Sequence, residues 1–238
     1  MAYQFDSRVR YSEIDMNRKL TVVSLVDYFQ DCSTFQSESL GYGLDYMEEN
    51  HLAWMVLSWQ IEIIRRPDFA EKITVVTWPY SFKAFYGYRN FALLDEKGEF
   101  LAKANSVWVL MDVAAGRPCR TLKEHTANFV MEPPLEMETA PRKMQIPQES
   151  QAQEAFCVGP HHLDTNHHVN NGQYIRMAEA YLPEDFETGR LWVEYRQQAH
   201  LNDRIIPKVY QEADQVIVSL CGEADNVYAV VNFQHFRK

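Results

Sequence analysis

Four side chains with acid, amide and imidazole groups lie close together in the C-terminal half: Asp164, Asn166, His167 and His168. Carboxylate and imidazole groups exchange protons near neutrality, and a carboxamide orients a carbonyl group or a water molecule. If the segment is extended, its side chains alternate, so Asp164, Asn166 and His168 share one face and His167 points to the other. The alternation therefore predicts His168, and not His167, as the proton acceptor.

A helix is expected directly after this segment, over residues 171–182. Its apolar positions recur at helical spacing: Tyr174, Ile175, Ala178, Tyr181 and Leu182. Asn170 or Asn171 is predicted to cap it, because a short amide side chain satisfies the free N–H groups of a first turn. The same N–H groups would be available to stabilise a developing oxyanion.

Asp and Asn also form loops before helices with no chemical role, so the cluster alone is not decisive. A second copy of the pattern elsewhere in the chain favours a catalytic role for the cluster. Residues 14–17, Ile-Asp-Met-Asn, resemble residues 163–166, Leu-Asp-Thr-Asn, and both stand just before a helix; Lys19 occupies the place of His168. Since the first copy enters its helix without a histidine, His168 is not needed for folding. Catalysis is therefore predicted in the C-terminal half.

The chain repeats one order of elements. In the first half, residues 8–20 are predicted as a strand that runs into an irregular segment, followed by a helix capped by Thr21 and ending near Gly41. Strands are then expected at 53–64, 72–78, 86–95 and 100–112, with a hairpin turn at 96–99. In the second half, strands are expected at 154–158, 191–200, 205–212, 215–222 and 227–235. The segment 114–153 contains Pro118, Pro133, Pro134, Pro141 and Pro147 and is predicted as a connector. This order predicts an α+β protein with regions 1–113, 114–153 and 154–238.

Two other chemistries are disfavoured. Histidines at 161, 162, 167 and 168 with Asp164 invite a metal site, but adjacent histidines of an extended chain point to opposite sides and no HExxH motif is present. The four cysteines (Cys32, Cys119, Cys157, Cys221) form no CxxC pair and are expected to be reduced and mostly buried. Cys157 and Cys221 lie in apolar runs, where a buried thiol is expected rather than a nucleophile. No metal or cofactor is predicted.

Composition limits the partners. The net charge of -10 opposes binding to nucleic acid or to an anionic membrane surface. No apolar run reaches the roughly 18 residues of a membrane span, and the N-terminus lacks a secretory layout, so a cytoplasmic protein is expected. An acidic protein partner would need a local basic patch, for which the candidates are Arg65, Arg66, Arg117, Arg120 and Lys123.

Two segments carry a resemblance to a known family. The pattern Asp-x-Asn-x-His-Val-Asn-Asn at 164–171, followed by Tyr174-Ile175, resembles the catalytic segment of the acyl-acyl-carrier-protein (acyl-ACP) thioesterases, which are double hotdog proteins. The segment 192–199, Trp-Val-Glu-Tyr-Arg-Gln-Gln-Ala, is similar to the family's strand that carries a Glu-Cys pair in plant members. Here these two positions are Gln198 and Ala199. The resemblance extends from Val9 to about Arg237.

The resemblance implies a double hotdog of two tandem repeats, each a long helix wrapped by an antiparallel sheet. It implies a thioester hydrolase acting on fatty acyl-ACP, with Asp164, Asn166, His168 and Gln198 catalytic. His168 would be the general base and Gln198 would position the water, because an amide cannot accept the proton. The N-terminal hotdog would house the acyl chain, with Trp54 and Met55 lining it. An acyl-CoA thioesterase, a dehydratase and a non-catalytic acyl-binding protein stay open as alternatives, as does the choice between monomer and homodimer.

Overall fold

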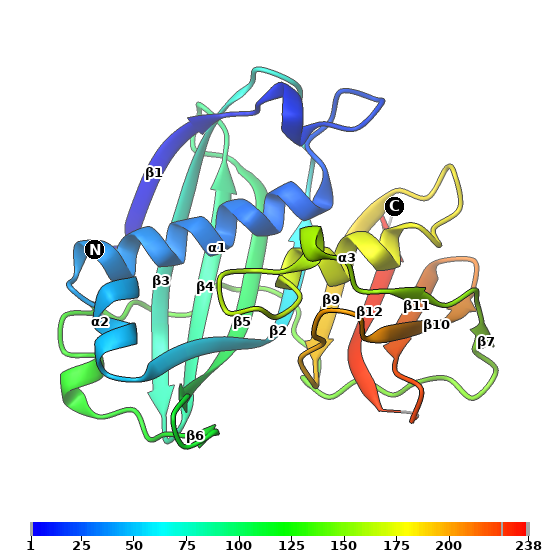
Figure 1. Ribbon diagram of the computed structural model, residues 1–238. Coiled ribbons are helices and arrows are strands. Elements are labelled where there is room, and N and C mark those ends of the chain that lie inside the picture. Colours follow the sequence, from blue (N-terminus) through cyan, green and yellow to red (C-terminus); the bar gives the residue numbers. More distant parts are fainter. Residues whose placement is uncertain (1, 225, 237–238) are drawn as a thin grey trace. The chain divides into compact units, whose positions relative to one another are not determined.

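The structure is a computed structural model that describes residues 2–224 and 226–236 (Figure 1). The chain divides into two compact units. The first comprises Met1–Leu57 and Ile61–Thr139, and the second comprises Ser58–Gln60 and Ala140–Lys238. None of the helices in the described ranges is long and apolar enough to cross a membrane.

The first unit is an antiparallel sheet covered by one long helix (Figure 1). Its strands lie in the order β1 (Tyr3–Arg8), β3 (Lys72–Lys83), β4 (Tyr86–Leu94), β5 (Phe100–Asp112) and β2 (Leu52–Ile63). The short strand β6 (Arg117–Pro118) pairs with β5, and α2 (Leu44–Glu49) follows the long helix. Between β4 and β5, Asp95 Oδ1 accepts the N–H groups of Lys97 and Glu99, which confirms the predicted hairpin turn.

The long helix α1 (Val22–Ser39) begins and ends as its sequence predicts. Thr21 Oγ1 accepts the N–H of Ser24 at 3.1 Å, and Gly41 has φ +79°, the left-handed conformation that glycine adopts most readily. Its side chains Leu25, Val26, Phe29 and Cys32 are buried, and Phe29 packs on Phe91 of β4 with ring centroids 5.3 Å apart. The strand predicted at the start of residues 8–20 lies earlier in the chain: β1 ends at Arg8 and a 3-10 turn occupies Tyr11–Glu13. The irregular segment predicted after the strand is a loop that closes on itself.

The second unit has the strand order β9 (Thr188–Tyr195), β12 (Val227–His235), β11 (Gln215–Cys221), β10 (Arg204–Gln211) and β7 (Gln151–Ala152), with β8 (Phe156–Cys157) also pairing with β10. Its helix α3 (Asn171–Glu179) contacts β11 and β12. Tyr174 and Ile175 are 2% and 0% exposed, so the apolar stripe of α3 faces the sheet.

Three sequence predictions for this unit are corrected. The helix ends at Glu179 and not at 182, so it has only nine residues and is not the long helix expected of each repeat. The strand expected at 154–158 is reduced to two residues, and Cys157 is exposed rather than buried. The strand expected to reach residue 200 stops at Tyr195, because the N–H groups of Arg196 and Gln197 both turn to the carbonyl of Tyr228.

The connector is irregular but fixed to each unit by hydrogen bonds. In the first unit the indole N–H of Trp78 donates to the carbonyl of Pro133 at 2.9 Å, and the N–H of Leu135 donates to Asn90 Oδ1 at 3.0 Å. In the second, the side chain of Gln60 exchanges two hydrogen bonds with the backbone of Ala140, at 2.6 and 2.8 Å. The units divide between residues 139 and 140.

Candidate active site

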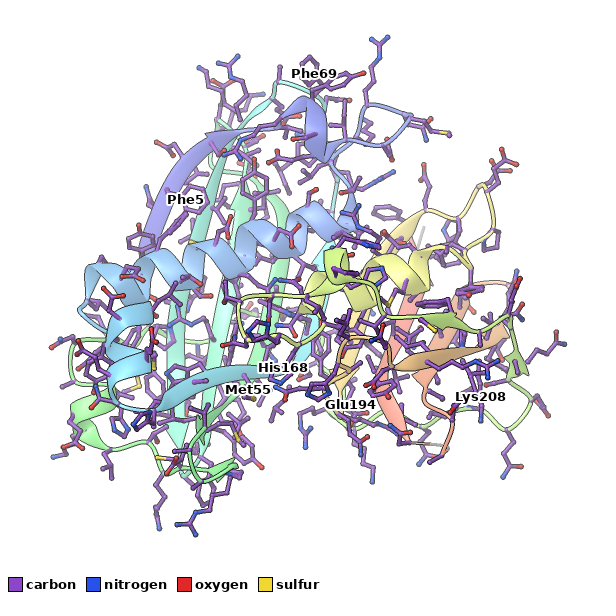
Figure 2. All side chains as sticks on the ribbon, in the orientation of Figure 1. Phe5, Met55, Phe69, His168, Glu194 and Lys208 are labelled. Carbon is purple, nitrogen blue, oxygen red and sulfur yellow. The ribbon has the colours of Figure 1, made fainter. Side chains whose placement is uncertain are left out.

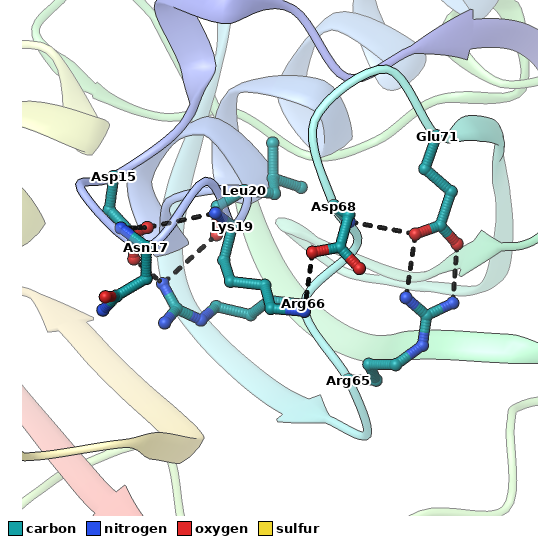
Figure 3. A network of polar contacts seen from close by, with 8 residues as sticks. All are labelled: Asp15, Asn17, Lys19, Leu20, Arg65, Arg66, Asp68 and Glu71. Carbon is teal, nitrogen blue, oxygen red and sulfur yellow. Dashed lines mark hydrogen bonds and ion pairs between the residues drawn. The ribbon is translucent and has the colours of Figure 1, made fainter.

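The loop before α1 is closed by one aspartate (Figure 3). Asp15 Oδ1 accepts the N–H groups of Asn17 at 2.8 Å and Lys19 at 3.0 Å, while the N–H of Asp15 donates to the carbonyl of Lys19 at 2.9 Å. Arg18 takes φ +59° to close the loop. An acidic side chain that accepts the N–H two residues later is a standard way to build such a turn.

The loop before α3 has the same geometry. Asp164 Oδ1 accepts the N–H groups of Asn166 at 2.8 Å and His168 at 3.2 Å, and the N–H of Asp164 donates to the carbonyl of His168 at 2.8 Å. His167 takes φ +61°. The segment is therefore not extended, and the alternation used to separate the two histidines is wrong. The turn separates them instead, since it leaves His167 exposed and His168 half-buried.

Each loop is pinned to a second loop at an equivalent point. The N–H of Leu20 donates to the carbonyl of Pro67 at 2.9 Å, and the N–H of Val169 donates to the carbonyl of Ala199 at 3.0 Å. The residues before these carbonyls are Arg66 and Gln198, and those after them are Asp68 and His200. Position 198 thus corresponds to an arginine in the first unit.

The side chains around the two loops differ where the backbones agree. In the first unit, Arg66 Nη1 lies 2.7 Å from Asp15 Oδ2 and Lys19 Nζ lies 2.8 Å from Asp68 Oδ1 (Figure 3). In the second, Asp164 Oδ2 has no hydrogen-bond partner or ion-pair partner within the described residues. Two ion pairs are thus replaced by a carboxylate oxygen and an imidazole that are free to act on a ligand.

His168, labelled in Figure 2, is suited to accept a proton. Burial lowers its pKa below the ordinary imidazole value, and the nearby ring of His200 adds to this, while the carboxylate of Asp164 opposes it. The rings of His168 and His200 meet edge to face, with centroids 4.9 Å apart. A lowered pKa means that the ring is neutral at pH 7, the form that takes a proton from water.

The other two predicted catalytic residues lie on either side of this imidazole in the chain. Asn166 is exposed, and its side-chain amide makes no hydrogen bond to any described residue. Gln198 is exposed too, in the loop that follows β9. Because β9 ends at Tyr195, Gln198 lies beyond the strand that was expected to reach residue 200. Glu194 is buried and its carboxylate binds Arg196 and the N–H of Met144, each at 2.8 Å, so it is a structural group.

Ala199 and the first residues of α3 are held in place around the site by hydrogen bonds. The N–H of Ala199 donates to the hydroxyl of Tyr174 at 2.9 Å, and burial raises the pKa of Tyr174, so that hydroxyl stays protonated. Asn170 is the helix cap, accepting the N–H of Gly172 on its side chain at 2.8 Å and that of Gln173 on its carbonyl at 2.9 Å. These two N–H groups are therefore already engaged and do not form the predicted oxyanion site.

The predicted acyl-contacting residues lie on β2 in the first unit. Trp54 and Met55 are both half-buried. The Trp54 ring packs on Phe82, with centroids 6.0 Å apart, and covers Gly87 so closely that a Cβ there would lie 3.2 Å from it. Their role as acyl contacts stays a prediction.

The basic residues proposed for an acidic partner are of two kinds. Arg65 and Arg66 are engaged, Arg65 with Glu71 through two bonds of 2.6 and 2.8 Å and Arg66 with Asp15. The others, Arg117, Arg120 and Lys123, are exposed.

His200 is the residue that sequence reasoning missed. Extending the internal alignment from Pro67 and Ala199 by one residue would have paired it with Asp68 and drawn attention to it.

Comparisons with known proteins place the chain in a family. The model described as the acyl-ACP thioesterase N-terminal domain matches residues 1–129, and that of the C-terminal domain matches residues 146–228. The acyl-(acyl-carrier-protein) hydrolase FATB3 of Cuphea viscosissima is 29% identical over 217 residues, covering 84% of this chain and 52% of the relative. Oleoyl-acyl carrier protein thioesterase 2 of Arabidopsis thaliana is 24% identical over 232 residues, covering 89% of this chain and 63% of the relative. The chain therefore spans between half and two thirds of the length of these relatives.

Solved structures agree on the fold. An acyl-ACP thioesterase from Bacteroides thetaiotaomicron superposes with a TM-score of 0.91 at 20% identity, over 99% of this chain and 98% of the other. A putative oleoyl thioesterase from Lactobacillus plantarum gives 0.85 at 24% identity, over 100% and 98%. The fold is of the hotdog type, antiparallel sheet with few helices. With the N-terminal model alone matching more than half of its residues, the chain belongs to the acyl-ACP thioesterase family.

Proposed function

We propose that this protein hydrolyses the thioester bond of fatty acyl-ACP and releases a free fatty acid. The observation that carries the proposal is the second loop. There Asp164, Asn166 and His168 offer a carboxylate oxygen, an amide and an imidazole with no described hydrogen-bond partner. The equivalent loop of the first unit uses Asp15 and Lys19 in ion pairs. Membership of a thioesterase family gives the reaction class.

The groups of the second loop support a general-base mechanism. Neutral His168 takes a proton from water as the water oxygen adds to the thioester carbonyl. Asn166 donates its amide N–H to the carbonyl oxygen, where negative charge develops. Asp164 stabilises the imidazolium formed on His168. The tetrahedral intermediate then collapses, the carbon–sulfur bond breaks, and the sulfur takes the proton from His168. Water and thioester become carboxylic acid and thiol, and Gln198 orients the water without accepting a proton.

The two units are assigned different tasks. Their matched loops support a tandem duplication of one hotdog unit, with a helix much shorter in the second copy than in the first. In the first copy both charged groups of the loop are neutralised by partners, so it has no proton acceptor to offer. We assign the acyl chain to the first unit, with Trp54 and Met55 as contacts, and catalysis to the second.

Thiol release from defined thioesters tests the function. The purified protein is incubated with fatty acyl-ACP, fatty acyl-CoA and 3-hydroxyacyl thioesters, with His168→Ala as the control. The proposal requires thiol release from acyl-ACP that His168→Ala abolishes. Release from acyl-CoA alone would reassign the carrier, loss of water from the 3-hydroxyacyl group would indicate a dehydratase, and acyl binding without turnover would mean a binding protein. Because the pKa of His168 is lowered, release should persist below pH 6.5.

A further inference from the structure

Position 200 is one of the points at which the two loops differ in charge. In the first unit Lys19 and Asp68 form an ion pair of opposite charges at 2.8 Å. The corresponding residues of the second unit are His168 and His200, whose rings are 4.9 Å apart at an interplanar angle of 79°. An attractive pair is thus replaced by two groups that can both become positive.

A backbone hydrogen bond holds residue 200 in place. The N–H of His200 donates to Asp203 Oδ2 at 2.9 Å, as the N–H of Asp68 donates to Glu71 Oε2 at 2.9 Å. The hydroxyl of Tyr228 donates to the same oxygen of Asp203 at 3.1 Å. Since an aspartate supports the same turn in the first unit, the fold does not require a ring at 200. Its side chain is 59% exposed, and its Nδ1 lies 3.8 Å from Asp203 Oδ2, an ion pair when the ring is protonated.

We propose that His200 is a positioning residue that holds His168 in its neutral, proton-accepting form. A proton on one ring repels a proton on the other, so the pair titrates as a unit in which the second proton binds with difficulty. Burial disfavours the charged form of His168, and a positive charge on the neighbouring ring acts in the same direction. His200 lies among the groups that lower the pKa of His168, second to burial. The catalytic consequence rests on the proposed function, whereas the coupling of the two rings does not.

Other titratable groups surround the pair and set the background. They are Asp164 and His167 in the loop of His168, Asp203 beside His200, Tyr174 of α3 and Tyr228 of β12. Asp164 attracts a proton to His168 and His167 repels it. Changing position 200 alone leaves the identity of these groups unchanged, and Asp203, 3.8 Å from the His200 ring, is the one in contact with the altered side chain.

The series is His200→Lys, His200→Asn and His200→Asp, measured in the full chain without substrate. The imidazole resonances are followed by NMR against pH, and His168 is identified by its loss in His168→Gln. A unit charge about 5 Å away at the surface shifts a pKa by roughly half a unit or more. The midpoint of His168 should therefore rise in the order Lys, wild type, Asn, Asp. The acid limb of thiol release should move in the same order, which a purely structural role would not produce.

His161 provides the matched control. Its ring lies against His162, with centroids 4.0 Å apart, and it is not among the groups that act on His168. The same three substitutions at 161 should shift His162 and leave His168 unchanged. If the 200 series leaves the His168 midpoint fixed, or if the 161 series moves it equally, the proposal is wrong. If no thioester is cleaved while the order of midpoints holds, the proposed function fails and the coupling of the two rings stands.

Discussion

One substitution made in both loops separates folding from chemistry. Asp15→Asn and Asp164→Asn each keep an oxygen that accepts the two backbone N–H groups, so both turns should persist. Each removes a negative charge. In the first unit that charge faces Arg66, and in the second it favours a proton on His168. The same change should therefore lower stability in one unit and turnover in the other.

The sizes follow from the contacts. Arg66 and Asp15 are each 24% exposed and 2.7 Å apart, so losing this pair should cost about 1 kcal/mol, near the upper end for ion pairs in contact with solvent. That corresponds to a fall in Tm of roughly 2–4 °C. Asp164 has no ion pair to lose, so Asp164→Asn should change stability by less than ~0.5 kcal/mol. Its turnover should fall at least ~10-fold, about 1.4 kcal/mol of lost imidazolium stabilisation in the transition state.

Thermal unfolding and thiol release from acyl-ACP measure the two effects on the same samples. The pH dependence of thiol release gives a further test. Because Asp164 raises the pKa of His168, Asp164→Asn should move the acid limb of the pH–rate profile to lower pH while lowering its plateau. Asp15→Asn should leave both limb and plateau unchanged. Equal losses of turnover in the two variants would refute the assignment of catalysis to the second unit.

Three further predictions use neighbouring positions. His168→Ala should reduce thiol release at least ~100-fold, as expected for a lost general base, and the exposed His167→Ala should change it little; similar losses would contradict the choice of imidazole. Gln198→Arg should recreate the ion pair of the first unit, raising stability by up to ~1 kcal/mol and abolishing release, as followed by Tm and thiol assay. Gly87→Ala should press on the Trp54 ring, 3.2 Å from the added Cβ, and change the profile of acyl chain lengths accepted; an unchanged profile would remove Trp54 from the acyl site.

Regular elements were predictable because local rules suffice for them. The cap at Thr21, the left-handed Gly41 and the turn before Phe100 are each set by one or two neighbouring residues. Element ends that depend on distant partners were not. The strand β9 ends at Tyr195 because the next two N–H groups donate to the carbonyl of Tyr228, and the local sequence does not predict these hydrogen bonds.

The choice of His168 over His167 was argued from a geometry that the chain does not adopt. Alternation assumes an extended chain, but Asp164 folds the segment into a loop that only side-chain hydrogen bonds define. The internal comparison is the stronger guide, since matching Asp15 with Asp164 places Lys19 opposite His168, and the structure shows the same backbone hydrogen bonds in both loops. The pairing of Asp68 with His200 lies outside the residues that were compared in sequence.

Residue 198 is neutral, whereas its counterpart in the first unit, Arg66, binds the carboxylate of the matched aspartate, Asp15. An arginine there, as at 66, would bind the second oxygen of Asp164 and remove the charge that stabilises imidazolium. A glutamate would add a second carboxylate near Asp164, and like charges would drive one of them to hold a proton. Glutamine keeps hydrogen-bonding capacity and adds no charge beside Asp164, and in the proposed mechanism this leaves His168 as the group that takes the proton from water.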